Sequence, residues 1–311
     1  MTTMRQAVAD YLALRRSLGF KLEEPGCLLR DFACFMDRAG ASHITTELAL
    51  AWATRPAAGT PYWYWLRLSA VRGLAAHLHA IDPAHQVPPA SLLPRQQHRP
   101  APYLFTKAEV TALMRAAGTL RDRLYAETYQ TLIGLLAVTG LRPGEAINLD
   151  PSHIDLRTAV LTVAEGKYGK SRELALQPST VEALAAYARL RDQLCPCPAA
   201  PSFFISTAGT RLLINRVDKV FAKLAKQAGL HPRSARWGPR PIDLRHTFAV
   251  TTLAGWYRAG ADIGARLPLL STWLGHARPA STYWYLHACP ELLALATERM
   301  TRAQHAQENR Q

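Results

Sequence analysis

Residues 159–176 read Ala159-Val-Leu-Thr-Val-Ala-Glu-Gly-Lys-Tyr-Gly-Lys-Ser-Arg-Glu-Leu-Ala-Leu176. Two short apolar runs flank a segment that contains two glycines, a pattern typical of a β-hairpin. The stretch therefore predicts a small antiparallel sheet in a chain whose other segments have helical spacing. Lys167 would lie near the hairpin tip, where it could be inserted into a groove, although a polar turn is the commoner meaning of such a segment.

The remaining segments have apolar residues at the three- and four-residue steps of helices. Four helices are expected in residues 1–90, enough for a small bundle with its own core. Prolines at six positions from Pro83 to Pro102 then interrupt any regular structure, so residues 91–102 are predicted to be a basic linker. Residues 103–311 would form the second domain.

Several start signals locate the helices of this second domain. Thr106 and Glu109 have the spacing of a capping box, which predicts a helix from that point. Further helices are expected over residues 121–139, from Pro143 and from Pro178 onward. The fold class is therefore mainly α with a small antiparallel β-sheet.

The charge balance points to a polyanionic partner. The chain has 37 Lys and Arg against 23 Asp and Glu, a net charge of +14, and such an excess favours nucleic acid and salt-sensitive binding. No apolar stretch is long enough to span a membrane, and the first residues lack the apolar core of a signal peptide, so a cytoplasmic protein with no membrane partner is expected. Cys195 and Cys197 have no further ligands close by in sequence, so no metal site is expected.

Three other segments carry residues suited to phosphate chemistry. Thr139-Gly-Leu-Arg-Pro-Gly-Glu145 places Arg142 at the start of a helix, where a side chain and the helix N-terminus can face the same anion. Ile242-Asp-Leu-Arg-His-Thr-Phe-Ala249 contains Arg245, and Leu274-Gly-His276 is followed by Ser281-Thr-Tyr-Trp-Tyr285. Taken singly, each has an ordinary structural explanation. Cleaving a phosphodiester without a metal needs a nucleophile, cations on the phosphate oxygens and an acid for the leaving oxygen.

The ordered set resembles the tyrosine recombinases of the phage integrase family, in a form similar to Xer recombinases and to transposon- or plasmid-borne members. The resemblance covers about residues 103–300, and Tyr285 lies nine positions after His276 (285 − 276 = 9). It implies a nucleophilic tyrosine that forms a 3′-phosphotyrosine, two arginines on the phosphate, a histidine hydrogen-bonded to it and a lysine acid. By this resemblance, the nucleophile is Tyr285 and the two arginines are Arg142 and Arg245. The histidine is His276 and the acid is Lys167. Glu145 and His246 are supporting residues.

The resemblance also implies architecture and partners. The N-terminal domain would be a helical core-binding domain, and the two domains would form a C-shaped clamp around double-stranded recombination sites. No cofactor is implied. Monomers would assemble into a homo-tetramer on DNA at the bacterial nucleoid. A second recombinase could act as a further partner. The expected DNA contacts are Arg15, Arg16, Lys21, Arg95, Arg99, Lys170, Arg172 and Arg240.

Two features depart from the pattern or compete with it. Family members usually carry histidine or lysine three positions before the second arginine, where this chain has Ile242, which cannot donate a hydrogen bond or carry a proton. We expect activity at a reduced rate, which cleavage by an Ile242→His variant would test. Tyr283 is a rival nucleophile two residues before Tyr285, but the spacing from His276 favours Tyr285.

Two alternative functions stay open from the sequence. A DNA-binding accessory protein that has lost catalysis would bind without covalent adducts, and Ile242 permits this reading. A type IB topoisomerase-like enzyme would share the tyrosine chemistry but act without a tetramer. Integration, excision, transposition and dimer resolution are not distinguished by the sequence.

Overall fold

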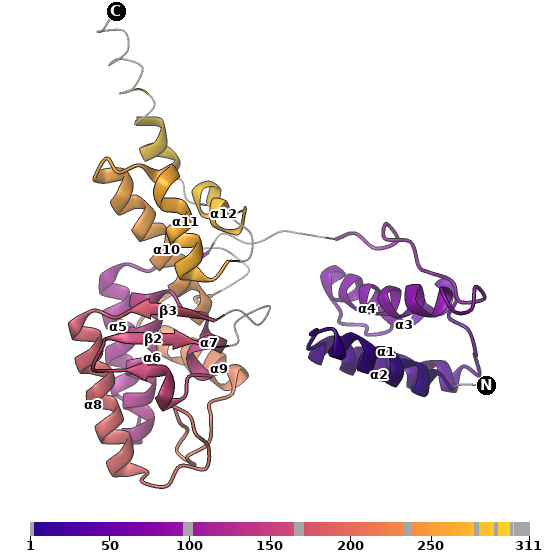
Figure 1. Cartoon of the computed structure of the whole chain (residues 1–311), viewed down its shortest axis with the longest axis horizontal. Helices are drawn as coiled ribbons and strands as arrows, with labels where there is room; N and C mark the ends of the chain where they lie inside the picture. The colour runs from indigo at the N-terminus through magenta and orange to yellow at the C-terminus, as the bar shows by residue number, and fades with distance from the viewer. Residues whose placement is uncertain are drawn as a thin grey trace, which may run out of the picture. The chain divides into compact units, whose positions relative to one another are not determined.

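The computed structural model divides the chain into two compact units, Met1–Arg99 and Pro100–Gln311 (Figure 1). Each unit has its own apolar core. The division falls inside the segment expected to be the linker. The described residues are mainly helical, with one three-stranded antiparallel sheet, which confirms the predicted fold class. The structure describes residues 3–95, 102–164, 171–232, 238–276, 280–288, 292–298 and 301.

The N-terminal unit contains four helices, α1 (Met4–Ser17), α2 (Glu23–Arg38), α3 (Thr46–Thr54) and α4 (Pro61–His79). Three begin at a threonine whose hydroxyl accepts a hydrogen bond from a backbone N–H of the first turn; these are Thr3, Thr45 and Thr60. Their core centres on Trp52, whose ring packs edge-on against Phe32 at a centroid distance of 5.1 Å. Arg67 lies 3.7 Å over the same indole and donates to the Trp52 carbonyl. This unit therefore has a complete core of its own.

The C-terminal unit begins with helices and then changes to the sheet. Its order is α5 (Lys107–Gly118), α6 (Arg123–Thr139), α7 (Pro143–Ile147), the 3-10 turn η1 (Pro151–His153), β1 (Ile154–Asp155), β2 (Val160–Val163), β3 (Arg172–Ala175), α8 (Pro178–Leu194), α9 (Ile214–Gln227), α10 (Pro241–Arg258), α11 (Ile263–Leu274) and α12 (Ala280–Ala288). The strands pair in the order β1-β2-β3, with Val163 opposite Arg172. The hairpin strands are confirmed, while the turn that carries Lys167 lies outside the described residues.

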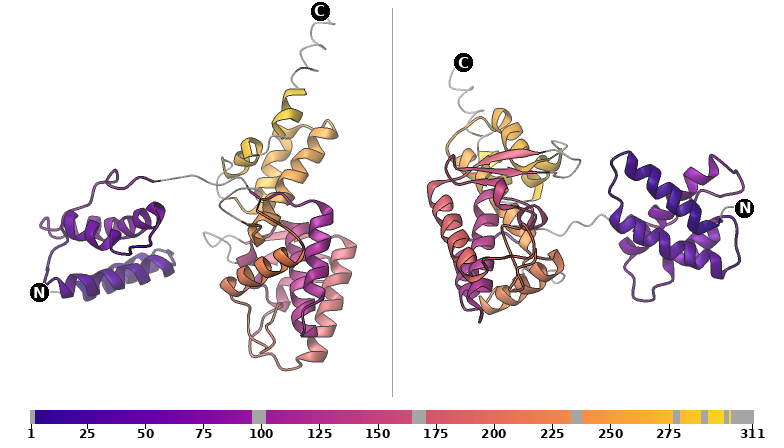
Figure 2. Two further views of the ribbon diagram at one scale, coloured as in Figure 1. Left: turned by 180° about the vertical axis from the view of Figure 1, so that it is seen from behind. Right: turned by 60° about the horizontal axis from the view of Figure 1, so that its bottom comes forward.

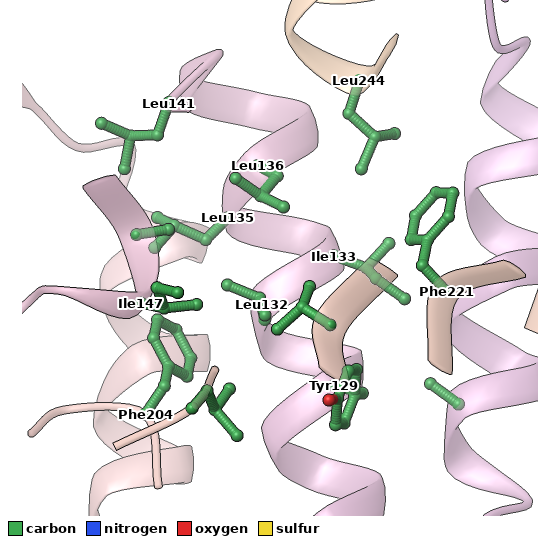
Figure 3. Close-up of a cluster of buried hydrophobic side chains, with 14 of the residues drawn as sticks. Tyr129, Leu132, Ile133, Leu135, Leu136, Leu141, Ile147, Phe204, Phe221 and Leu244 are labelled. Carbon is green, nitrogen blue, oxygen red and sulfur yellow. The ribbon is translucent and has the colours of Figure 1, made fainter. Parts of the chain in front are cut away.

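Helix α6 runs through the main core of this unit. Tyr129, Leu132, Ile133 and Leu136 are all buried on it, and Figure 3 shows Phe221 and Leu244 facing them from other elements. A helix that is apolar on most sides needs neighbours around it, and α5, α8 and α10 supply them. The Thr139 end of α6 is thereby held in place, and the turn that carries Arg142 starts there.

Helices α10, α11 and α12 enclose a second apolar cluster, which includes Leu253, Leu270 and Tyr285. In both views of Figure 2 these orange-to-yellow helices lie together at one end of the C-terminal unit. Among the described residues, no helix combines the length and apolar character that a membrane span requires.

Candidate active site

A glycine turn places Arg142 at the start of α7. Helix α6 ends at Thr139, and Gly140 adopts φ +65°, a left-handed conformation that glycine reaches without strain. A Cβ on Gly140 would also meet the Phe248 ring at 2.5 Å. The chain reverses at this point, and Arg142 becomes the residue that precedes Pro143 and caps the next helix.

Glu145 is the acidic centre of the site. Its side chain is only 9% exposed, and its carboxylate accepts hydrogen bonds from the Arg142 backbone N–H at 2.9 Å and from Arg142 Nη1 at 2.6 Å. Arg172 Nη1 and Nη2 donate to the same carboxylate at 3.2 and 2.9 Å. Burial raises the pKa of Glu145, but the hydrogen bonds from Arg172 and Arg142 outweigh burial and lower this pKa to about 2. Glu145 is therefore ionised at neutral pH.

Arg245 lies behind Glu145 on α10 and is almost completely buried. Its Nη1 donates to the Gly140 carbonyl at 2.9 Å and its Nη2 to the Leu274 carbonyl at 2.6 Å, so the guanidinium joins the ends of α6 and α11. Burial, with repulsion from Arg142, lowers the pKa of Arg245 to about 10. The group keeps its charge at neutral pH, where it can stabilise an anion at the site.

His276 follows the left-handed Gly275 that ends α11. Its Nδ1 lies 2.7 Å from the Thr282 hydroxyl, and its ring stacks on that of Tyr285 at a centroid distance of 6.1 Å. Burial, and then repulsion from Arg245, Arg142 and Arg172, lowers the pKa of His276 to about 4. The imidazole is therefore neutral at pH 7, and it can donate one hydrogen bond or accept one at its outer nitrogen.

The two candidate tyrosines point in different directions on α12. Tyr285 is 2% exposed and lies among His246, His276 and Trp284, whereas Tyr283 is 50% exposed. Residues two apart on a helix face nearly opposite sides. Of these two tyrosines, the structure thus brings Tyr285 to the cluster of Arg245 and His276.

The remaining residues predicted on this unit occupy distinct places. His246 packs against the rings of Trp284 and Tyr285 at centroid distances of 5.3 and 5.5 Å. Ile242 is half-buried in the first turn of α10. Arg240 caps that helix and pairs with the buried Asp243 through Nη2 at 2.9 Å. Lys167 and Lys170 lie outside the described residues.

Five residues predicted to contact DNA fall within the N-terminal unit, and one of them, Arg99, lies outside the described residues. Arg15 lies 3.9 Å over the Phe20 ring, and Arg16 Nε donates to the Lys21 carbonyl at 3.4 Å. The exposed Arg95 lies 5.1 Å from the Trp65 ring. Arg15, Arg16 and Lys21 thus lie around the end of α1, while Arg95 lies beside α4.

The sequence analysis counted Arg172 among the expected DNA contacts and did not identify polar bonds for Thr282 or Trp273. In the structure, the Arg172 side chain is 10% exposed, and its Nε donates to the Trp273 carbonyl at 2.8 Å. Trp273 Nε1 donates to the Thr139 carbonyl at 2.8 Å. Only tertiary structure reveals the two bonds of Trp273, because they join residues 101 and 134 positions apart in sequence.

One trio of metal-type ligands occurs among the described residues, in the N-terminal unit. His43 Nε2 lies 3.1 Å from Asp82 Oδ2, and His85 is close to both. However, His85 Nδ1 accepts the Ile44 N–H at 3.1 Å, which leaves the proton of the neutral ring on its other nitrogen. The trio therefore serves to join two loops by hydrogen bonds.

Comparisons with known proteins reveal relatives over most of the chain. Residues 104–291 match the family model described as phage integrase family. The chain is 44% identical over 308 residues to a Sinorhizobium fredii protein named integrase/recombinase y4rB, covering 97% of this chain and 98% of the relative. It is 32% identical over 223 residues to tyrosine recombinase XerC of Pseudomonas entomophila, covering 71% and 67%.

A solved structure shares the fold. The Tn1549 transposon integrase in complex with a circular intermediate DNA aligns over 96% of this chain and 100% of that one, with a TM-score of 0.65. The two sequences are 18% identical, so this likeness concerns the fold alone.

Proposed function

Because the chain belongs to the phage integrase family, we propose that it is a site-specific recombinase that cleaves and rejoins double-stranded DNA through a 3′-phosphotyrosine at Tyr285. Family membership itself supports an enzyme that breaks and rejoins DNA. The observation that carries the finer proposal is a cluster of side chains. Arg142 donates to Glu145 at 2.6 Å, and Arg245 Nη1 lies 4.0 Å from the same carboxylate. Beside them, the rings of His276 and Tyr285 stack.

Each residue has a proposed task. Arg142, whose side chain is 30% exposed, reaches the scissile phosphate, while the buried charge of Arg245 stabilises the phosphate oxygens from behind. Neutral His276 donates a hydrogen bond to one of these oxygens. Glu145 holds Arg142 in position. Because it is ionised, it offsets part of the positive charge of the arginines around it.

The proposed reaction has two transesterification steps, a cleavage and a rejoining. The Tyr285 oxygen forms a bond to phosphorus, and the bond from phosphorus to the 5′ oxygen breaks. Lys167 is proposed to protonate that leaving oxygen. The phenolic proton is proposed to pass to water, because Ile242 offers no group to accept it. A 5′ hydroxyl from a partner strand then attacks the phosphorus, the bond from phosphorus to the Tyr285 oxygen breaks, and the phenol regains a proton, so that rejoining needs no external energy source.

The partners follow from the same proposal. Double-stranded recombination sites would be bound by phosphate contacts, which give affinity, and by base contacts, which set the site. Assembly as a tetramer on two sites, at the bacterial nucleoid, remains part of the proposal, as does the clamp expected from the sequence. The alternative of a recombinase that has lost catalysis is not favoured by these relatives.

Covalent trapping tests the proposed function. The protein is incubated with nicked duplexes taken from the DNA that flanks its own gene, and a denaturing gel is run. Wild type and Tyr283→Phe should form a slow-migrating adduct, and Tyr285→Phe should form none. An adduct lost in Tyr283→Phe and kept in Tyr285→Phe would overturn the assignment of the nucleophile.

A further inference from the structure

We infer that Arg172 is a positioning residue, which ties Glu145, and through it Arg142, to the end of α11 beside His276. The inference rests on the proposed function and adds a residue to its machinery. It also changes the role of Arg172 from the DNA contact that its basic, hairpin-flanking sequence suggested.

Each of the three nitrogens of the Arg172 guanidinium donates a hydrogen bond inside the protein. Nε donates to the Trp273 carbonyl at 2.8 Å, while Nη1 and Nη2 donate to the two oxygens of Glu145 at 3.2 and 2.9 Å. The Arg172 side chain is 10% exposed and that of Glu145 is 9% exposed. A buried, two-pronged pair of this kind fixes geometry and leaves Arg172 poorly placed to reach a DNA phosphate.

Glu145 carries this constraint to Arg142. Its Oε1 accepts from both Arg142 Nη1 and Arg172 Nη1, and its Oε2 accepts from the Arg142 backbone N–H as well as from Arg172 Nη2. Arg142 Nη2 also lies 3.4 Å from the Gly275 carbonyl. The two arginines thus hold one carboxylate between them, and a change in the Arg172 bonds must alter the support of Arg142.

The residue at position 275 is matched to Arg172. A Cβ on Gly275 would lie 2.7 Å from Arg172 Nη1 and 2.9 Å from Cζ. The arginine cannot move aside without losing its bonds to Glu145 and Trp273. Gly275 therefore serves two purposes, since its φ of +66° turns the chain toward His276 and its missing side chain admits the guanidinium.

The backbone of Arg172 links the site to the hairpin. Arg172 is the first residue of β3, where it pairs with Val163 of β2, and β3 contacts α11. Lys167 belongs to the segment between these strands, which lies outside the described residues. Arg172 therefore anchors the base of the segment that carries the proposed acid.

Lysine cannot replace this arginine. A lysine has one nitrogen and cannot bond two carboxylate oxygens and a carbonyl in one plane. Arg172→Lys keeps the positive charge but cannot form the three hydrogen bonds to Glu145 and Trp273 together. The variant therefore distinguishes a positioning role from an effect of charge alone. Arg191→Lys is the matched control, because Arg191 is similarly buried and bonds to Asp192 and the Phe203 carbonyl away from the site.

The first arm of the test needs no DNA. In the free protein, the order of the Arg142 side chain is measured from ¹⁵N relaxation of its Nε–H group. We expect this order to fall in Arg172→Lys and to stay at the wild-type value in Arg191→Lys. Unchanged order of Arg142 in a folded Arg172→Lys protein would overturn the inference, even if the chain proved not to cleave DNA.

The second arm uses the flanking-DNA duplexes that the wild type cleaves. Arg172→Lys should slow single-turnover cleavage about tenfold or more, the loss expected for a charge-assisted hydrogen bond, with unchanged DNA affinity and salt dependence. The double variant with Glu145→Gln should be no slower than the slower single variant. Additive losses, or weaker binding with a salt slope reduced by about one, would show instead that Arg172 acts alone or contacts a phosphate.

Folding is controlled with a second variant. Arg172→Gln keeps a donor for the Trp273 carbonyl and removes the charge, and both variants are compared with wild type by thermal melting. If Arg172→Lys melts early, the same two arms on Arg172→Gln decide the matter. A Gln variant with normal Arg142 order and normal cleavage would overturn the inference.

Discussion

At the scale of single residues, the surroundings of His276 decide its protonation. Burial and three nearby arginines lower its pKa to about 4 from an ordinary value of 6.5. A histidine that is neutral at pH 7 cannot add a positive charge to the phosphate, so its contribution is a directional hydrogen bond. Thr282 at 2.7 Å from Nδ1 fixes the ring for that purpose.

The first prediction concerns this titration. In ¹⁵N spectra of the folded protein, the His276 ring should titrate near pH 4, and the signal should be absent from His276→Gln. Because the folded pKa is lowered, the unfolded chain binds more protons between about pH 4 and 6.5. This contribution to stability is present above pH 6.5 and is lost as the pH falls toward 4. A midpoint at 6.5 or higher would contradict the account.

The sequence predicted the direction of a side chain where helical periodicity determines it. It did not predict bonds that form only through tertiary contacts. The two-residue offset between Tyr283 and Tyr285 is enough to expect opposite directions, and their exposures of 50% and 2% agree with that expectation. The bonds of Arg172 to Glu145 and Trp273 span 27 and 101 positions. A basic residue beside a hairpin gives no sign in sequence that it turns inward.

At the scale of elements, local signals located most boundaries. The Thr106–Glu109 capping box is present with both of its hydrogen bonds, and helices begin at Pro143 and Pro178 as predicted. The strand β1 was not predicted, because two residues carry no period. Helix α2 begins at Glu23, so Pro25 lies in its first turn, where proline is tolerated.

The turn between α6 and α7 yields a prediction about a single element junction. Gly140→Ala should lower the free energy of unfolding by about 2 to 4 kcal/mol, since it combines left-handed strain with a clash against Phe248. Gly229→Ala is the matched control, because its φ is +73° but no atom lies within 4 Å of the added Cβ. Urea unfolding should show a loss of about 1 to 2 kcal/mol there.

The same pair of variants also separates the site from general stability. The Gly140 carbonyl accepts a hydrogen bond from Arg245 Nη1 at 2.9 Å. A shifted turn should therefore lower the rate of DNA cleavage in Gly140→Ala and leave this rate unchanged in Gly229→Ala. Equal losses of stability in the two variants would mean that the Phe248 ring moves aside at little cost and that no clash arises at this junction.

At the scale of the whole molecule, the sequence predicted two domains, and the structure has two compact units that divide at residues 99 and 100. Because of the net charge of +14, we expect the proposed DNA binding to weaken as the salt concentration rises.

The whole-molecule prediction concerns the C-terminal segment, residues 301–311, which we expect to dock on a second protomer. Leu292 is buried in the cluster around α10 to α12, so this residue belongs to the unit's own core. Truncation after Met300 should leave cleavage of a single site intact and weaken recombination between two sites. Gel assays of both reactions provide the measurement, and undiminished recombination would rule out docking by the tail.

The central claim is that Tyr285 carries the covalent link to DNA, and peptide mapping of a trapped adduct tests it most directly. The adduct formed on a nicked duplex from the flanking DNA is digested with nuclease and protease, and mass spectrometry locates the residual nucleotide. The account predicts a nucleotide joined through its 3′ phosphate to Tyr285. A nucleotide on Tyr283 or on any other residue would contradict it.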